Sequence, residues 1–196
     1  MKKLGKFIAI GTIFSTVEEF LTVVVLRHDT GSYVFTLLVL FPVFLTLVFY
    51  SSRLLDGLFS NEPAREVAHY LVYGAAGLMI EWFLIGLSPW SNPQANWILM
   101  LVFQLGMFSF WATVGFVPRL FLNPAEASVR TRKSIAGFYA PYFLFVYLVA
   151  AIAPREKKFG VLIPLILFGY LFLNVFYLRY FQHQFSSAKS AGNLGG

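Results

Sequence analysis

Long apolar runs alternate along this chain with short polar breaks. A helix of roughly 20 apolar residues is long enough to cross the hydrocarbon core of a bilayer. The runs that approach this length lie at 4–26, 33–51, 67–87, 97–117, 135–153 and 159–181. We therefore predict an all-α protein, an integral membrane bundle of six transmembrane helices.

The breaks between the runs contain the residue types that end helices. Each carries proline, glycine or a capping residue, and they lie at 27–32, 61–63, 88–93, 123–124 and 154–158. No break is long enough to separate two domains, so residues 1–185 are predicted to form a single six-helix transmembrane domain. The small and polar segment 186–196 is expected to be a disordered C-terminal tail.

Two segments are expected at the inner membrane surface. Residues 53–59 form a short amphipathic pattern after the second run, which is typical of a helix lying on the surface. Residues 119–133 follow the fourth run and are rich in arginine, so they are expected to form a basic loop at the interface.

The composition excludes an ordinary soluble domain. Hydrophobic residues make up 58% of the chain and charged residues 12%, and the mean hydropathy is +0.71, so too little polar surface would remain to face water. Cysteine is absent, which excludes disulfides and thiolate chemistry. The first run has no small-residue cleavage site, and we expect an uncleaved span.

The net charge of +6 comes from basic residues in short clusters at predicted helix ends. This placement is typical of topology determinants and of contacts with anionic membrane lipids, and it does not indicate nucleic-acid binding. The segments on the N-terminal side of the membrane hold most of them, namely Lys2, Lys3, Lys6, Arg53, Arg65, Arg119, Arg130, Arg132, Lys133, Arg179 and Lys189. The opposite loops hold only Arg27, Arg155, Lys157 and Lys158. The excess predicts a multi-pass protein of the bacterial cytoplasmic (inner) membrane with both termini in the cytoplasm.

Acidic residues within a span are costly and usually functional. In the first predicted helix, Glu19 shares a face with hydroxyl residues from Thr12 to Thr22, and Glu18 lies beside that face. Two adjacent carboxylates in apolar surroundings should include at least one that is protonated or paired. The alternative is a helix–helix seam of small hydroxyl residues, with the glutamates bonded across it.

The third predicted helix carries a comparable face. Tyr73, Gly77 and Glu81 recur on it at helical spacing. Glycine permits the close approach of a neighbouring helix or of a ligand one turn from the carboxylate. The alternative is ordinary small-residue packing, with the glutamate bonded to a neighbour.

The depths of these carboxylates along their helices are similar. At 1.5 Å per residue, Glu18 and Glu19 lie about 12 Å below the outer end of their helix, and Glu81 lies about 10 Å below. We predict that these three side chains bind or protonate a ligand. The ligand-binding residues predicted around them are Thr22, Tyr73, Gly77, Gln104, Trp111, Tyr147, Tyr170 and Asn174.

Metal chemistry is not predicted. His28, His69 and His183 share no metal-ligand spacing, and no cofactor motif occurs. The 23 Phe, 10 Tyr and 4 Trp are typical of lipid-facing surfaces and interfacial belts. An aromatic cavity for an apolar or cationic intermediate is the alternative.

Two short segments resemble a known family. Glu81-Trp82, followed by Trp90-Ser91-Asn92-Pro93, resembles part of the bacterial-type membrane lycopene cyclases. Glu18-Glu19-Phe20-Leu21 is similar to the paired-glutamate motif of that family, without its preceding proline and in the reverse order along the chain. The resemblance implies a carboxylic acid that protonates a polyene inside the membrane. Gln104 stands where that family has its glutamates.

The leading hypothesis is an intramembrane carboxylate site that binds or protonates a lipid or isoprenoid-like molecule. A carboxyl group in an apolar pocket can serve as an acid near neutral pH. A second hypothesis is a small-solute transporter or its membrane substrate-binding subunit. A third is a non-catalytic subunit or scaffold of a larger membrane complex. The expected partners are membrane lipids, together with an apolar ligand or other membrane subunits, and whether the protein is an enzyme stays open.

Overall fold

The computed structural model describes residues 2–86, 88–90 and 96–193, and within these ranges the chain forms helices and no strand. Six helices in this part of the chain are long and apolar enough to cross a membrane, and they span Lys2–Leu26, Thr30–Leu58, Glu62–Ile85, Trp97–Leu122, Glu126–Ile152 and Arg155–Ser190. The prediction of an all-α chain with six long apolar helices is confirmed.

The first three of these helices contain both α-helical and π-helical parts. The first consists of α1 (Lys2–Glu19) and η1 (Phe20–Leu26). The second consists of α2 (Thr30–Phe35), η2 (Thr36–Leu40) and α3 (Phe41–Leu58). The third consists of α4 (Glu62–Ile80) and η3 (Glu81–Ile85). The other three are continuous α-helices, namely α5 (Trp97–Leu122), α6 (Glu126–Ile152) and α7 (Arg155–Asn193).

Side-chain caps begin several of the helices. Asp29 caps α2 and accepts hydrogen bonds from the hydroxyl and the main-chain N–H of Ser32. These bonds favour the charged carboxylate and hold the pKa of Asp29 below its ordinary value. Asn61 and Asn96 cap α4 and α5 in the same way. At the other end of η3, Gly86 has a φ of +82°, which glycine adopts at no steric cost.

The structure differs from the expected surface segments. The basic loop predicted at 119–133 is wrong, because α5 continues to Leu122 and α6 begins at Glu126. Arginine is a good helix former and does not end a helix, and the chain breaks only at residues 123–125. Arg132 donates to the main-chain oxygen of Phe121 at 2.8 Å. Residues 53–58 belong to the last turns of α3, and α7 remains helical beyond residue 185, as far as Asn193.

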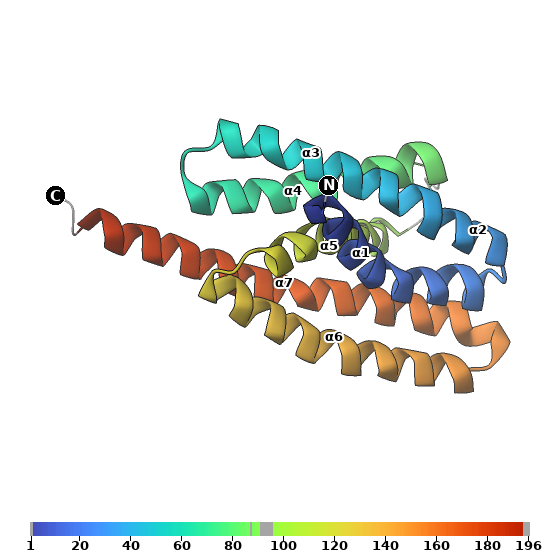
Figure 1. Cartoon of the computed structure of the whole chain (residues 1–196). Coiled ribbons are helices and arrows are strands. Elements are labelled where there is room, and N and C mark those ends of the chain that lie inside the picture. Colours follow the sequence, from blue (N-terminus) through green and yellow to red (C-terminus); the bar gives the residue numbers. More distant parts are fainter. Residues whose placement is uncertain (1, 87, 91–95, 194–196) are drawn as a thin grey trace.

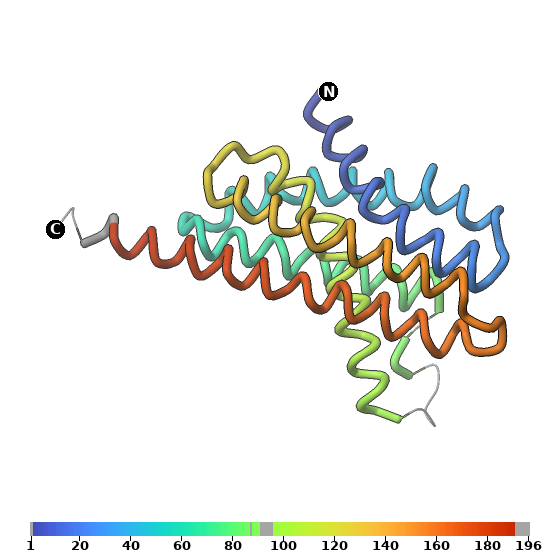
Figure 2. Tube along the Cα trace, turned by 90° about the horizontal axis from the view of Figure 1, so that it is seen from below, coloured from blue at the N-terminus to red at the C-terminus, as the bar shows by residue number. Residues whose placement is uncertain are grey.

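Helix α5 lies at the centre of the bundle. It packs against α1, α3, α4, α6 and α7, and all of its residues from 109 to 118 are buried. Figure 1 shows α3 beside α4 and α6 beside α7 as two hairpins, with α5 between them. In Figure 2, the first turns of α5 extend beyond the bundle on one side and those of α1 on the opposite side. From residue 109 to residue 118 this apolar helix is therefore surrounded by other helices, whereas its first turns are exposed.

The two ends of the bundle differ in the helix connections that they contain. We call the end with the α3–α4 and α5–α6 connections the inner end, and the end with the connections after η1 and after α6 the outer end. The last part of α7 projects past the other helices at the inner end (Figure 1).

Helices α4 and α5 interlock through two glycines. An added Cβ at Gly77 of α4 would lie 2.0 Å from Cγ of Trp111 on α5. In the reverse direction, an added Cβ at Gly115 of α5 would lie 2.9 Å from Cδ2 of Tyr73 on α4. Each helix therefore places a large ring where the other helix has no side chain, and this exchange sets how closely the two backbones approach.

Gly77→Ala should destabilise the protein by about 1–3 kcal/mol, because the new methyl group overlaps a part of Trp111 close to its backbone. The measurement is thermal unfolding of the purified protein in detergent micelles. Gly137→Ala is the matched control, because an added Cβ there meets no atom within 4 Å. Equal melting temperatures for the two variants would contradict the interlocking described here.

Candidate functional site

Glu81 and Trp111 form the best-defined polar contact near the outer end. Glu81 is the first residue of η3, and only 5% of it is exposed. The indole Nε1 of Trp111 donates to the Glu81 carboxylate at 2.9 Å. Trp111 itself fills the space over Gly77 and is also held by Phe41 and Phe44 of α3. The carboxylate therefore has a fixed partner in the core of the bundle.

Glu18 and Glu19 approach the same place from α1. Glu18 is 7% exposed and Glu19 is half-buried. Both lie within electrostatic reach of Glu81, and Arg27 in the outer turn lies within reach of all three. The hydroxyl of Thr22 donates to the main-chain oxygen of Glu18 at 3.0 Å. Glu18 and Glu19 thus lie within electrostatic reach of Glu81, with Trp111 bonded to Glu81 and Thr22 bonded to the main chain of Glu18. We call this group the carboxylate site.

Both helices change from α to π geometry at the carboxylate site. Glu19 is the last residue of α1 before η1, and Glu81 opens η3. A π-helical turn is wider than an α-helical one, is rare, and occurs frequently at functional sites. The change in helical geometry alters the direction of the side chains that follow. Each of these glutamates therefore lies where the α-helical face ends and a π-helical face of different orientation begins.

Two of the predicted tyrosines bond to the main chain of α1 on the inner side of the glutamates. Tyr147 donates to the oxygen of Val17 at 3.3 Å, and Tyr170 to the oxygen of Phe14 at 3.4 Å. Tyr139, which the sequence analysis missed, donates to the same Phe14 oxygen at 2.6 Å and lies 3.2 Å from the Tyr170 hydroxyl. These tyrosines fasten α6 and α7 to α1 directly below the carboxylate site.

The two amide residues among the predicted ligand-binding residues, Gln104 and Asn174, make contacts elsewhere. Gln104 accepts from the indole of Trp82 at 2.7 Å. Asn174 donates to the hydroxyl of Ser109 at 2.8 Å and accepts from Tyr70. These bonds link α5 to η3, and α7 to α5 and α4, and they do not involve the carboxylates of the site.

The segment that resembles the lycopene cyclases is described only in part. Trp90 packs edge-on against Trp82, with ring centroids 5.2 Å apart. Residues 91–93 of that segment lie outside the described residues.

A second group of charged side chains lies at the inner end. Glu66 of α4 is 3% exposed and accepts from both Nε and Nη2 of Arg119 on α5, with the shortest distance at 2.7 Å. The same guanidinium lies 3.2 Å from Oδ1 of Asp56 on α3, and Arg65 lies 3.4 Å from that oxygen. Two acids and two arginines therefore balance in charge where three helices meet. We call this group the inner ion cluster.

His69 and Tyr73 extend the inner ion cluster towards the middle of the bundle. His69 is fully buried, with Nδ1 2.8 Å from the main-chain oxygen of Arg65 and Nε2 3.5 Å from Oδ1 of Asp56. The ring of Tyr73 follows at a centroid distance of 5.6 Å, and its hydroxyl is buried. Sequence reasoning placed Tyr73 near the outer carboxylates, whereas the structure places it beside this cluster.

The inner ion cluster has a recognisable sequence signal. Glu66, His69 and Tyr73 follow one another at helical spacing on the α4 face that also carries Gly77 and that leads to Glu81 at the start of η3. Extending the predicted face by two turns towards the start of the helix would have identified Glu66 and His69. Their partner Arg119 was interpreted as a topology determinant only.

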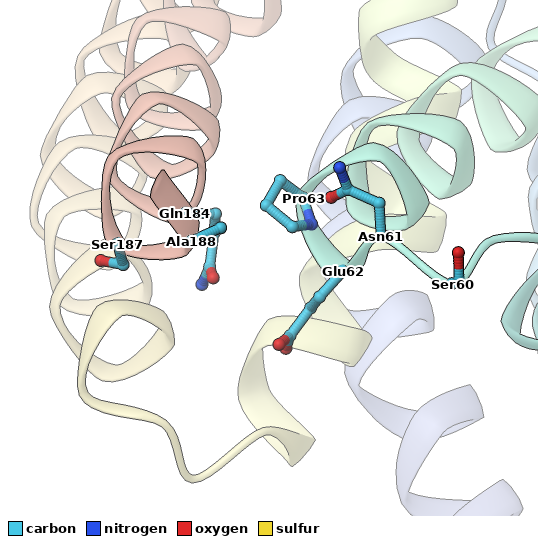
Figure 3. A pocket seen from close by; sticks show the side chains of 7 residues that line it. All are labelled: Ser60, Asn61, Glu62, Pro63, Gln184, Ser187 and Ala188. Carbon is cyan, nitrogen blue, oxygen red and sulfur yellow. The ribbon is translucent and has the colours of Figure 1, made fainter. Parts of the chain in front are cut away.

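An open groove lies beside the inner ion cluster. Figure 3 shows its two sides, the connection into α4 and the projecting part of α7, and its lining residues are Ser60, Asn61, Glu62, Pro63, Gln184, Ser187 and Ala188. Glu62 lies 3.9 Å from Arg65 and so joins the groove to the rim of the cluster. The lining is polar and carries one charge, which provides little to hold a specific ligand.

Comparison of the chain with models of protein families, with characterised proteins and with solved structures gives no significant match in any of the three.

Glu66→Ala should reduce the free energy of unfolding by about 3–5 kcal/mol, because it leaves the buried charge of Arg119 without its main partner. Unfolding of the purified protein in detergent by heat or by SDS measures this. The double variant Glu66→Leu/Arg119→Met removes both charges and should recover part of the loss.

The matched control is Glu126→Ala, which breaks an exposed ion pair with Arg130 and should change stability by less than about 1 kcal/mol. An effect of Glu66→Ala as small as that of the control would show that the inner ion cluster does not hold the helices together.

Proposed function

We propose that this chain is a multi-pass protein of the bacterial cytoplasmic membrane, with both termini cytoplasmic, and that its carboxylate site holds a lipid or isoprenoid-like molecule in the outer half of the bilayer. The observation that supports the proposal is that Glu18 and Glu19 of one helix lie within electrostatic reach of Glu81 of another, where both helices turn from α to π.

Carboxylates in apolar surroundings need hydrogen-bond or charge partners. Glu81 has Trp111, whereas Glu19 is half-buried and lies closer to the surface of the bundle. A hydroxyl or amine head group would give Glu19 a partner, and a protonated carboxyl could in turn deliver a proton to a double bond. These two roles correspond to binding and to acid catalysis at the same site.

The surroundings of the site support an apolar ligand that arrives from the bilayer. Next to Glu81, Phe83 is 72% and Leu84 is 73% exposed. Next to Glu19, the ring of Phe20 lies between those of Tyr33 and Tyr147, at centroid distances of 5.9 and 5.8 Å. An isoprenoid chain would find apolar and aromatic contacts on both sides of the carboxylates.

The proposed orientation predicts the accessibility of single cysteines, which the chain naturally lacks. Lys157→Cys at the outer end should react with a membrane-impermeant maleimide in intact bacterial cells. Ser187→Cys at the inner end should react only after the membrane is permeabilised. Mass-tagging of the purified variants measures both, and the reverse pattern would contradict the orientation.

Glu19→Gln and Glu81→Gln should each weaken isoprenoid binding about tenfold, which corresponds to the loss of about 1.4 kcal/mol from one hydrogen bond to a charged group. The probe is geranylgeraniol that carries a diazirine beside its hydroxyl, photolysed with the protein in lipid vesicles. Mass spectrometry of the peptides should place the adducts near residues 19–26 and 81–85.

Glu126→Gln is the control, because Glu126 is exposed at the inner end and should leave labelling unchanged. Unchanged labelling in both site variants, or adducts spread evenly over the apolar surface, would contradict the proposal.

A proton-coupled transporter is the second candidate. It is favoured by one observation: Glu66, His69 and Tyr73 follow one another on α4, and Glu81 follows at the start of η3, so that titratable groups lead from the inner ion cluster to the carboxylate site. Chains of titratable groups across a membrane protein are typical of proton relays. A pH-sensitive dye trapped in proteoliposomes separates the two candidates. Proton movement that Glu81→Gln abolishes, without loss of isoprenoid labelling, would favour transport.

A further inference from the structure

A groove between α6 and α7 at the inner end combines positive charge with an apolar floor. Both helices contribute to its lining, which consists of Ala127, Arg130, Thr131, Ser134, Phe176, Arg179, Tyr180 and His183. The groove lies at the other end of the bundle from the carboxylate site, and none of its lining residues belongs to the inner ion cluster, which is formed by α3, α4 and α5.

The basic side chains of this groove are available to a ligand. Within the described residues, no carboxylate lies at ion-pair distance from Arg179 or His183. Arg130 lies 3.0 Å from Glu126, but their side chains are 70% and 87% exposed. A pair so exposed is worth little energetically, and an anion can compete with it. The groove therefore offers two guanidinium groups, which suit the oxygens of a phosphate.

An aromatic strip continues the groove towards the middle of the bundle. Phe176 lies in the groove, and its ring centroid is 5.9 Å from that of Phe172 on α7 and 5.9 Å from that of Phe138 on α6. Phe138 and Phe172 lie 4.6 Å apart. All three rings are partly exposed on the outside of the α6–α7 hairpin. The strip therefore offers an apolar surface directly below the basic groove.

We infer that this groove is a binding site for an anionic phospholipid of the inner leaflet. Its phosphate lies between Arg130 and Arg179, with His183 at the rim, and an acyl chain runs along the strip of Phe138, Phe172 and Phe176. The inference uses the membrane orientation proposed above and does not depend on the carboxylate site. Basic pockets between helices on the cytoplasmic side of membrane proteins suit phospholipid head groups.

The arrangement of a basic groove followed by an aromatic surface along α6 and α7 favours a lipid over a soluble phosphate compound. Between the groove and the charged residues 155–158 at the outer end, neither helix carries a charged residue, and the surface directly below the groove is aromatic. A free phosphate or nucleotide would use the arginines and leave the strip unoccupied. A phospholipid in a bilayer meets the head-group site and the strip at the same time.

Native mass spectrometry of the detergent-purified protein tests the inference, with phosphatidylglycerol as the probe and phosphatidylcholine as the zwitterionic comparison. The wild type should retain phosphatidylglycerol preferentially. Arg130→Gln/Arg179→Gln should reduce that retention at least tenfold, and Arg179→Lys should retain an intermediate amount, because lysine keeps the charge but loses the bidentate geometry. Phe172→Ala should weaken the retention of both lipids.

The matched control is Arg53→Gln. Arg53 is also exposed near the inner end, on α3, where it packs over the rings of Phe49 and Tyr50. Loss of phosphatidylglycerol only in the groove variants supports the site. Equal retention in the double variant, or an equal loss in Arg53→Gln, overturns it. Displacement of the lipid by excess inorganic phosphate would overturn the assignment to a lipid, because phosphate alone would then satisfy the groove.

The thermal unfolding of each variant in detergent is measured in parallel. The substituted arginines lie on the surface, so the melting temperatures should equal that of the wild type. If the double variant unfolds, the test uses the single variants Arg130→Gln and Arg179→Gln. Reduced phosphatidylglycerol retention in them supports the site, and full retention in both would overturn the inference.

Discussion

The close contact of α4 with α5 determines most of this structure. Trp111 fits against Gly77, and Tyr73 fits against Gly115, so the two backbones approach more closely than larger residues would allow. Polar contacts secure the pair on both sides of these glycines, with Glu81 bonded to Trp111 and Glu66 to Arg119. In an apolar surrounding such contacts and close packing hold helices together, because burial of apolar surface gains little there.

The other helices are arranged around this pair. Because α5 is buried on all sides through residues 109–118, α1, α3, α6 and α7 each pack on it. The hydroxyls of Tyr139, Tyr147 and Tyr170 then bond to main-chain oxygens of α1. Main-chain oxygens of a helix are already used once, and a second bond from tyrosine adds a cross-link without exposing a polar group. The part of α1 that precedes its two glutamates is thereby fixed to α6 and α7.

The six helices were predictable from sequence because hydrophobic length is a property of single segments, which needs no knowledge of neighbours. The carboxylates could likewise be assigned a similar depth, because the number of residues to the outer end of each helix is read directly from the sequence. Which residues touch across helices was not predictable in this way. Tyr73 and Asn174 lie on the expected faces but contact His69 and Ser109, because helix rotation and neighbour order depend on packing of the whole bundle.

Arginine was the residue type that sequence reasoning interpreted least well. A count of basic residues treats Arg119 as a marker of the cytoplasmic side, and its role in an ion pair with Glu66 becomes visible only when α4 and α5 lie side by side. The boundary between α5 and α6 was also not predictable from the count of basic residues. The predicted basic loop is replaced by the end of α5 and the start of α6, where Arg132 donates to the main-chain oxygen of Phe121.

The exchange of rings and glycines between α4 and α5 also limits how this protein can change during evolution. A residue with a side chain at position 77 fits only if position 111 becomes glycine, because the Cβ of Trp111 itself would lie 2.1 Å from the new Cβ. Positions 115 and 73 are linked in a similar way, with 3.0 Å to the Cβ of Tyr73. A single substitution at any of the four passes through a poorly packed intermediate, whereas a paired one does not. These positions are therefore expected to co-vary between related proteins, and the aromatic residue could move from one helix to the other while the distance between the helices stays the same.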